Sequence, residues 1–282
     1  MKAPVFDFTR ALSVADAVAL LADTARFTKP LAGGQSLGPM LNLRVAFPEH
    51  LIGVRQIESL RQAFIDPANG DLVLGAAVPH AQIEDGLIPD VTQGLLAHVA
   101  ANIAYRAVRN RGTVGGSLAH ADPAADWVNT MPLLGARMVA VGLAGEREID
   151  ARTFMTGPFT TALDEHELLV AVRVPALGKN ARWGYVKFCR KPGEFAEAVG
   201  GVLIDRARGI GRLVMGATDG APIVLEESAE RVRAASSDSA VAAHWTDARL
   251  SAAIDAAGIG HDPYSAQLHL TMARRAIAVA LA

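Results

Sequence analysis

Two short glycine-containing segments could bind an anion. The first is Leu31-Ala32-Gly33-Gly34-Gln35-Ser36-Leu37, and the second is Thr113-Val114-Gly115-Gly116-Ser117. Paired glycines allow backbone conformations with positive φ, and a turn of this kind can direct several N–H groups into one concavity. Glutamine, serine and threonine add side-chain donors. Either segment alone is more typical of a tight turn, but together they could hold one extended phosphate-bearing molecule from two sides.

Other kinds of site are disfavoured. Neither segment matches the G-x-G-x-x-G pattern of dinucleotide-binding domains, and neither contains a P-loop lysine. Cys189 is the only cysteine, so this chain alone can form no disulfide and ligate no iron–sulfur cluster. The 8 histidines show no metal-ligand spacing, and no Ser-His-Asp set can be assigned. We therefore expect neither a metal site nor catalytic residues on this chain.

Charge and hydropathy argue against nucleic acid and membrane as binding partners. The chain has 282 residues and a net charge of −2, without a run of lysine and arginine, which argues against nucleic-acid binding. No apolar run reaches the roughly 18 residues of a membrane-spanning helix. The N-terminus has no apolar signal region. These features predict a cytoplasmic globular protein.

The elements around the first segment predict a small α/β unit over residues 1–56. Ser13 is the expected N-cap of a helix that ends near residue 25. A strand over 27–32 leads into the glycine segment, and a short helix over 37–43 follows it. A second strand is expected at 51–54.

The second segment follows the clearest helical pattern in the chain, which predicts one helix over 90–110. Arg106, Arg109 and Arg111 gather at its end, where cations complement the helix dipole. Asp122-Pro123 predicts the start of the next helix.

The remaining elements are mostly antiparallel. Hairpins are expected where 64–65 meets 72–76 across Asn69-Gly70, and where 138–141 meets 146–149. Further strands are expected at 168–174, 185–190, 200–205 and 210–217, and residues 226–282 are expected to be helical. Helices and strands are mixed without strict alternation, so the predicted fold class is α+β.

Three motifs together resemble a known family. They are Ala32 to Leu37, the run from Arg109-Asn110-Arg111-Gly112 to Asp126, and Arg190-Lys191-Pro192-Gly193-Glu194-Phe195-Ala196. In this order they resemble the FAD-binding medium subunit of molybdenum hydroxylases, of the carbon monoxide dehydrogenase medium-chain and xanthine dehydrogenase FAD-subunit type. The resemblance spans essentially the whole chain. It implies a two-part FAD-binding domain of the p-cresol-methylhydroxylase type at 1–177, divided near residue 56 into 1–56 and 57–177, and a smaller C-terminal domain at 178–282.

The resemblance also implies which residues contact FAD. The two glycine segments would wrap its pyrophosphate and the neighbouring sugar and ribityl groups. Asp126 would accept hydrogen bonds from cofactor hydroxyls, while Leu169, Lys187 and Phe195 would lie near the flavin ring. His120 would be a loop donor, because this family holds FAD non-covalently. The implied set is Ala32, Gly33, Gly34, Gln35, Ser36, Leu37, Thr113, Val114, Gly115, Gly116, Ser117, His120, Asp126, Leu169, Lys187 and Phe195.

The implied function is electron transfer within a complex. A large subunit with a molybdenum–molybdopterin cofactor would hydroxylate the substrate, and a small subunit would carry two [2Fe–2S] clusters. This chain would take electrons from those clusters and pass them to an external acceptor, in a heterotrimer or a dimer of heterotrimers. An N-heterocycle such as a purine is the preferred substrate, ahead of an aldehyde or carbon monoxide. The acceptor stays open among quinone, NAD, oxygen and a carrier protein. Two alternatives are a self-contained flavin oxidase or reductase and a non-catalytic scaffold.

Overall fold

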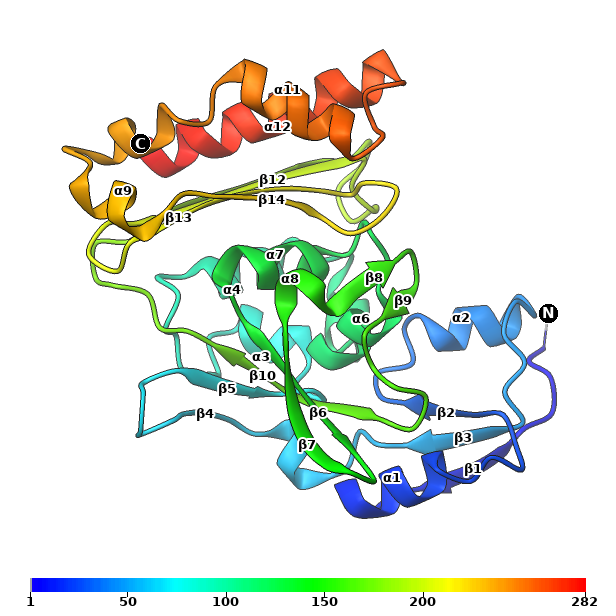
Figure 1. The fold of residues 1–282 in the computed structure, drawn as a ribbon. Coiled ribbons are helices and arrows are strands. Elements are labelled where there is room, and N and C mark those ends of the chain that lie inside the picture. Colours follow the sequence, from blue (N-terminus) through cyan, green and yellow to red (C-terminus); the bar gives the residue numbers. More distant parts are fainter. Residues whose placement is uncertain (1) are drawn as a thin grey trace.

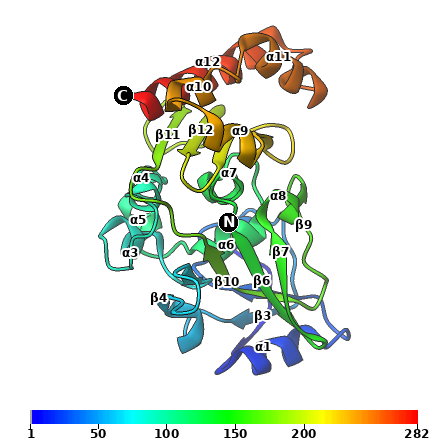
Figure 2. The ribbon, with the colours of Figure 1, turned by 60° about the vertical axis from the view of Figure 1, so that its left-hand side comes forward.

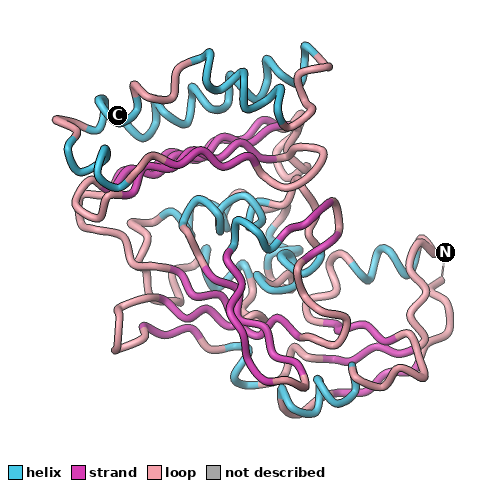
Figure 3. Tube along the Cα trace, viewed as in Figure 1, coloured by secondary structure: helices cyan, strands magenta, loops and turns pink. Residues whose placement is uncertain are grey.

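The computed structural model describes residues 2–282 and stacks sheets and helices in layers (Figure 1). It contains a three-stranded, a five-stranded and a four-stranded sheet, together with a two-stranded ribbon. Figure 3 shows the helices lying between and outside these sheets. The mixture of helices with mainly antiparallel sheets confirms the predicted α+β class.

The first sheet is parallel and carries the first glycine segment at its edge. Its order is β1-β3-β2, with β1 at Asp7–Arg10, β2 at Thr28–Leu31 and β3 at His50–Gly53. Helix α1 (Val14–Leu21) begins as predicted, because the Ser13 side chain accepts a hydrogen bond from the Asp16 N–H. Strand β2 leads through the glycine segment into α2 (Leu37–Asn42).

The second sheet has the order β4-β5-β10-β6-β7. The two predicted hairpins are confirmed, since β4 pairs with β5 and β6 pairs with β7, both antiparallel. The strand bounds are Ala63–Ile65 (β4), Leu72–Gly75 (β5), Arg137–Gly142 (β6), Gly145–Asp150 (β7) and Leu168–Val174 (β10). Strand β10 completes the sheet by joining the two hairpins.

Helices cover this sheet around the buried Trp127. They are α3 (His80–Glu84), α4 (Leu95–Ala101), α5 (Arg106–Arg109), α6 (Val114–His120), α7 (Asp126–Leu134) and α8 (Ala151–Phe154). The short elements are the 3-10 helix η1 (Glu58–Arg61) and strands β8 (Met155–Gly157) and β9 (Thr160–Thr161).

Two helix predictions are wrong in this region. The single helix over 90–110 is instead a turn followed by α4 and α5, with a break at Asn102–Tyr105 where Ala104 has φ of 40°. The apolar stripe is present, but carbonyls in the break accept side-chain hydrogen bonds instead of continuing the helix. The expected start at Asp122-Pro123 is a turn in which Asp122 accepts from the Ala124 N–H, and α7 begins only at Asp126.

The third sheet lies between two helical layers. Its order is β11-β12-β13-β14, with bounds Arg182–Phe188, Ala198–Asp205, Ile210–Gly216 and Ile223–Glu226. Helix α12 (Pro263–Leu281) contacts one face and α7 contacts the other, as Figures 1 and 2 show. The helical tail is confirmed with α9 (Ala229–Ala234), α10 (Asp238–Ala242), α11 (Asp247–Ala256) and α12. Strand β14 was not predicted.

Hydrophobic packing crosses the predicted domain boundary. The largest buried cluster runs from Leu72 in the second sheet to Val214 in the third. The second sheet and one side of the third sheet therefore share a core, while separate clusters lie at the first sheet and between the third sheet and the C-terminal helices. No helix among residues 2–282 combines the length and the hydropathy needed to cross a membrane.

Candidate functional site

The two glycine segments, hereafter the first loop (Leu31–Leu37) and the second loop (Thr113–Ser117), lie against each other. A Cβ atom on Gly33 would be 2.1 Å from the Arg111 carbonyl oxygen, directly before the second loop. A Cβ atom on Gly116 would be 3.9 Å from the Ala32 Cβ. Glycine at position 33 is therefore required by close backbone packing between the loops.

The first loop keeps its backbone donors free. Within residues 2–282 no acceptor is found for the N–H groups of Gly33, Gly34, Gln35, Ser36 and Leu37. Gly34 has φ of 72°, which glycine adopts without steric cost. Ser36 occupies the N-cap position of α2, but its side chain makes no capping hydrogen bond. A series of such unpaired N–H groups is an anion-binding concavity.

In the second loop, by contrast, the backbone N–H groups donate hydrogen bonds to other parts of the protein. The N–H groups of Val114, Gly115 and Gly116 donate to the Val78 carbonyl, the Ala76 carbonyl and the Thr113 hydroxyl at 3.2, 2.9 and 3.1 Å. A Cβ atom on Gly115 would lie 2.4 Å from the Ala76 Cβ, so α6 sits directly on the end of β5. The second loop therefore supports the site, and its half-buried Ser117 hydroxyl stays available as a side-chain donor.

This arrangement fits the diphosphate of FAD. A diphosphate needs many donors and close backbone approach, and its negative charge is stabilised by N–H groups that have no other partner. The first loop meets these needs, and the second loop holds it in place through the contact of Arg111 with Gly33.

Asp126 and Lys187 form a buried ion pair. The Lys187 Nζ lies 2.8 Å from Asp126 Oδ2, and the Tyr185 hydroxyl donates to Asp126 Oδ1 at 3.0 Å. Burial raises the pKa of the Asp126 carboxyl, and the Lys187 charge opposes this rise. Burial, together with the negative charge of Asp126, also raises the pKa of the Tyr185 hydroxyl. The structure thus joins two residues predicted separately, on α7 and β11, and each carboxylate oxygen retains capacity for another donor.

The break between α4 and α5 is tied to this pair. Lys187 Nζ also donates to the Asn102 carbonyl at 2.8 Å. On the other side of the break, Arg109 donates to the Ile103 and Ala104 carbonyls at 2.8 and 3.0 Å. A continuous set of polar contacts therefore runs from α5 through the break to β11.

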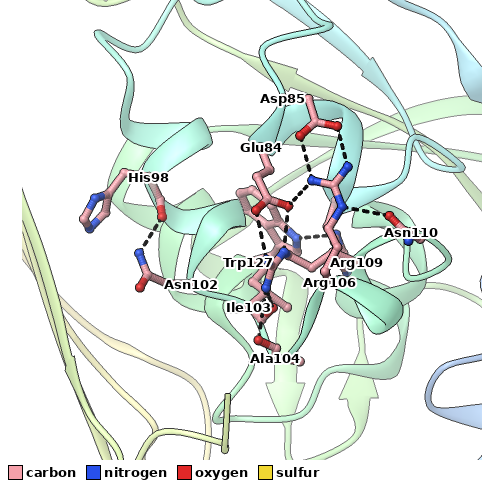
Figure 4. Close-up of polar contacts among 11 residues, drawn as sticks. Glu84, Asp85, His98, Asn102, Ile103, Ala104, Arg106, Arg109, Asn110 and Trp127 are labelled. Atoms are coloured by element: carbon pink, nitrogen blue, oxygen red, sulfur yellow. Dashed lines mark hydrogen bonds and ion pairs between the residues drawn. The ribbon is translucent and has the colours of Figure 1, made fainter. Parts of the chain in front are cut away.

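Acidic residues at the end of α3, Glu84 and the following Asp85, hold α5 in place (Figure 4). Arg109 donates to both carboxylate oxygens of Glu84 at 2.7 and 2.9 Å, and Arg106 donates to both oxygens of Asp85 at 2.6 Å. Bidentate arginine–carboxylate pairs fix geometry as well as charge. Of the three arginines predicted to complement the helix dipole, Arg106 and Arg109 therefore have specific carboxylate partners, whereas Arg111 has none within residues 2–282.

His80 lies behind the second loop. The backbone N–H of His80 donates to the Gly112 carbonyl at 3.0 Å, and the ring Nδ1 accepts from Trp127 Nε1 at 3.0 Å. Burial, helped by the charge of Arg109, lowers the pKa of His80 to about 4. The imidazole is therefore neutral at pH 7, with its proton on Nε2.

Three predicted site residues lie apart from these groups. Leu169 is a buried core residue of β10, beside a register shift against β6. His120 ends α6 with its ring centroid 5.2 Å from that of Phe159, and burial lowers the pKa of His120. Phe195 is 68% exposed, in a loop whose Gly193 packs against Tyr105.

Sequence reasoning missed Tyr185, Asn102 and His80. Tyr185 had a usable signal, because residues two apart on a strand share a face and Lys187 was already implicated. Asn102 acts through a carbonyl, and His80 depends on Trp127, so no local pattern marks either one. No group of three or more metal-ligating side chains occurs in the described part of the chain.

Comparison with known proteins gives a consistent result. Residues 4–177 match the family model described as the FAD binding domain in molybdopterin dehydrogenase. The chain is 37% identical over 82% of its length to the carbon monoxide dehydrogenase medium chain of Hydrogenophaga pseudoflava, covering 80% of that protein. It is 34% identical over its full length to the 6-hydroxypseudooxynicotine dehydrogenase complex subunit alpha of Paenarthrobacter nicotinovorans, covering 96% of that protein.

Comparison with solved structures points to the same kind of protein. The fold superposes on carbon monoxide dehydrogenase from Hydrogenophaga pseudoflava lacking the Mo-pyranopterin moiety, with a TM-score of 0.82 and 32% identity, covering 100% of this chain and 99% of that one. Quinoline 2-oxidoreductase from Pseudomonas putida 86 superposes with a TM-score of 0.81 and 28% identity, covering 99% of this chain and 98% of that one.

Proposed function

This chain belongs to the FAD-binding medium subunits of molybdenum hydroxylases, and on that premise we propose that it is an electron-transfer subunit. It takes electrons from [2Fe–2S] clusters on a partner subunit and passes them to an external acceptor. The observation that best supports FAD binding is that the backbone N–H groups from Gly33 to Leu37 in the first loop have no acceptor within residues 2–282. Bound FAD supplies a redox centre that accepts electrons singly or in pairs and becomes more negative on reduction.

The first loop would hold the FAD diphosphate through its free N–H groups and the Ser36 hydroxyl. The second loop would add the Ser117 hydroxyl and a close backbone surface. The other residues proposed to contact FAD are Ala32, His120, Leu169 and Phe195. Ala32 belongs to the first loop and His120 ends α6, while Leu169 and Phe195 are included because the family resemblance implies them, and all four stay proposals.

The Asp126–Lys187 pair would orient and tune the cofactor. Lys187 uses two of its three N–H donors on Asp126 and the Asn102 carbonyl, which leaves one donor for the flavin, while its positive charge is paired with the Asp126 carboxylate. Asp126 would accept from cofactor hydroxyls with its remaining lone pairs.

Replacement of Lys187 by methionine removes this charge at nearly constant length. Loss of a cation beside a group that gains negative charge disfavours reduction, so the reduction potential of the bound flavin is expected to fall. The measurement is a redox titration followed by flavin absorbance. Tyr185→Phe, which changes the same cluster without removing the cation, is the control. An unchanged potential in Lys187→Met would remove Lys187 from this role.

The partners follow from what this chain lacks. With Cys189 as its only cysteine, it cannot ligate a [2Fe–2S] cluster by itself. A small subunit would carry the clusters and a large subunit the molybdenum–molybdopterin cofactor. We further propose 1–177 as the FAD-binding part, divided near residue 56, and 178–282 as the C-terminal part.

The substrate is proposed to be an N-heterocycle. Among the relatives, the caffeine dehydrogenase subunit beta of a Pseudomonas strain is 33% identical over 72% of the chain and covers 69% of that protein. The quinoline enzyme points to the same chemical class. Relatives named for carbon monoxide and glyceraldehyde represent the other candidates.

The test begins with flavin content. The purified full chain should show a flavin spectrum, and acid precipitation should release all flavin, because attachment is non-covalent. Full turnover should require the two partner subunits. Turnover of an organic substrate by this chain alone would favour a self-contained oxidase, and absence of flavin after reconstitution would favour a scaffold.

A further inference from the structure

A basic pocket opens on the side of α3 and η1. Its volume is about 500 Å³. It is lined by Arg55, Gln56, Arg61, Ala77, Pro79, Ala81, Gln82 and Asn110. None of these residues belongs to the first or second loop, but Pro79 pairs with Thr113, so the pocket borders the second loop without including any residue proposed to contact FAD.

The arginines at this pocket have no carboxylate partner. Within residues 2–282, no carboxylate oxygen lies within 4.0 Å of the side-chain nitrogens of Arg55, Arg61 or the adjoining Arg111. Arg55 donates only to the Asn110 carbonyl, at 3.3 Å. Burial, followed by the charges of Arg111 and Arg61, lowers the pKa of Arg55. The fold therefore gathers like charges without neutralising them.

Two neighbouring arginines do form ion pairs with carboxylates. Arg106 and Arg109 lie in the same segment as Arg111; Arg109 pairs with Glu84 at the end of α3, and Arg106 pairs with Glu84 and the following Asp85. The chain has 29 acidic residues. Convergence of unpaired guanidinium groups beside a pocket is unfavourable by itself and indicates an anionic ligand, because guanidinium binds phosphate in bidentate geometry.

The lining limits the ligand further. Ala77 and Ala81 are buried, which leaves the half-buried Pro79 as the accessible apolar part of the lining, while Gln56 and Gln82 bring amide groups. A volume of about 500 Å³ is typical of sites for small organic ligands, whereas a protein partner would need a broad surface. A small phosphorylated molecule whose ring contacts Pro79 matches the cationic part and this apolar residue.

We propose that this pocket binds a nucleoside diphosphate or the equivalent part of a dinucleotide, as a ligand separate from FAD. Arg55 and Arg61 bind the phosphates, and the ring contacts Pro79. Occupation is communicated to the first loop, because Arg55 contacts Asn110 and the neighbouring Arg111 carbonyl packs against Gly33. This site goes beyond the proposed electron-transfer function and does not depend on it.

Calorimetric titration of the FAD-loaded full chain with ADP tests the proposal. One ADP should bind per chain without releasing flavin, inorganic pyrophosphate should bind more weakly, and adenosine more weakly still. Arg55→Ala combined with Arg61→Ala should weaken ADP binding by about tenfold or more, since each lost charge-assisted contact removes affinity. Arg275→Ala, an exposed arginine on α12 without an ion pair in residues 2–282, should leave it unchanged.

Two controls keep the result decisive. Flavin content and the unfolding temperature should be unchanged in the double variant, and the single variant Arg61→Glu, at an exposed position, should also weaken ADP binding. Release of flavin by ADP, or equal ADP affinity in the double variant, would overturn the proposal. So would an absence of ADP binding together with weaker association of the iron–sulfur subunit in the double variant, which would reassign the arginines to protein docking.

Discussion

The two glycine loops are similar in sequence but differ in what their backbone donors do. In the first loop the N–H groups from Gly33 to Leu37 have no acceptor within residues 2–282. In the second loop the corresponding groups are bonded to Ala76 and Val78, in the turn directly after β5, and to Thr113. A glycine-rich segment can therefore provide either ligand contacts or close packing, and hydrogen-bond accounting separates the two uses. Changes in the second loop should affect stability, and changes in the first loop should affect flavin binding.

Gly115→Val is expected to have the largest effect. The new side chain would begin 2.4 Å from the Ala76 Cβ and 2.8 Å from Ala76 backbone atoms, which cannot move without disturbing β5. Such overpacking should lower the free energy of unfolding by about 3 kcal/mol or more. Urea unfolding of the apoprotein measures this. Gly38→Val, just after the first loop, adds a Cβ that meets no atom within 4 Å and should change stability far less.

Acid should destabilise the second loop through His80. The folded-state pKa of about 4 lies below the ordinary value of 6.5, so the unfolded chain binds a proton that the folded chain does not. This group therefore contributes full stability above pH 6.5 and loses about 3 kcal/mol as the pH falls to 4. Unfolding of the apoprotein across this window measures the slope. His80→Phe should flatten it, and an unchanged slope would contradict the buried neutral imidazole.

Gly34→Ala should separate binding from stability in the first loop. Alanine is strained at φ of 72° but meets only the Leu31 side chain, at 3.5 Å, so the stability cost should be about 1 kcal/mol. The altered N–H directions should weaken FAD binding by about tenfold, given the charge-assisted contacts involved. Gly70→Ala is the matched control, since Gly70 has φ of 81°, no atom within 4 Å of the new Cβ and a place in a distant hairpin. Equal flavin affinity in both variants would argue against the first loop as the diphosphate site.

The smallest expected difference concerns the two N-cap residues. Thr113 accepts from the Gly116 N–H, whereas Ser36 makes no capping hydrogen bond. Thr113→Val should therefore lower the free energy of unfolding by about 1 kcal/mol, and Ser36→Ala should leave it within about 0.5 kcal/mol. Thermal unfolding of the apoproteins provides the comparison. Similar losses in both variants would remove the distinction between the loops.

Much of the fold was accessible from the sequence because hydrophobic period and turn residues are local signals. Asn69-Gly70 correctly placed a hairpin, and Ser13 correctly placed a helix start. The helix over 90–110 failed because Arg109, bound to Glu84, also bonds the Ile103 and Ala104 carbonyls. That outcome depends on a residue from α3, which no local window contains.

The candidate site shows the same limit. Paired glycines identified both loops, but only the structure shows that Gly115 is needed for packing on Ala76. Asp126 and Lys187 could be chosen one by one, yet their ion pair depends on the third sheet meeting α7. Composition could not show that Arg55, Arg61 and Arg111 lack carboxylate partners while Arg106 and Arg109 have them.

The buried contact of Asp126 with Tyr185 and Lys187 has a consequence for synthesis on the ribosome. Residues 1–177 are complete while β11 is still to be made, so at that stage Asp126 lacks both of its side-chain donors. A buried carboxylate without partners is costly. The pairing of Asp126 is therefore completed only after β11 has emerged, which couples the final packing at the start of α7 to translation of the C-terminal part.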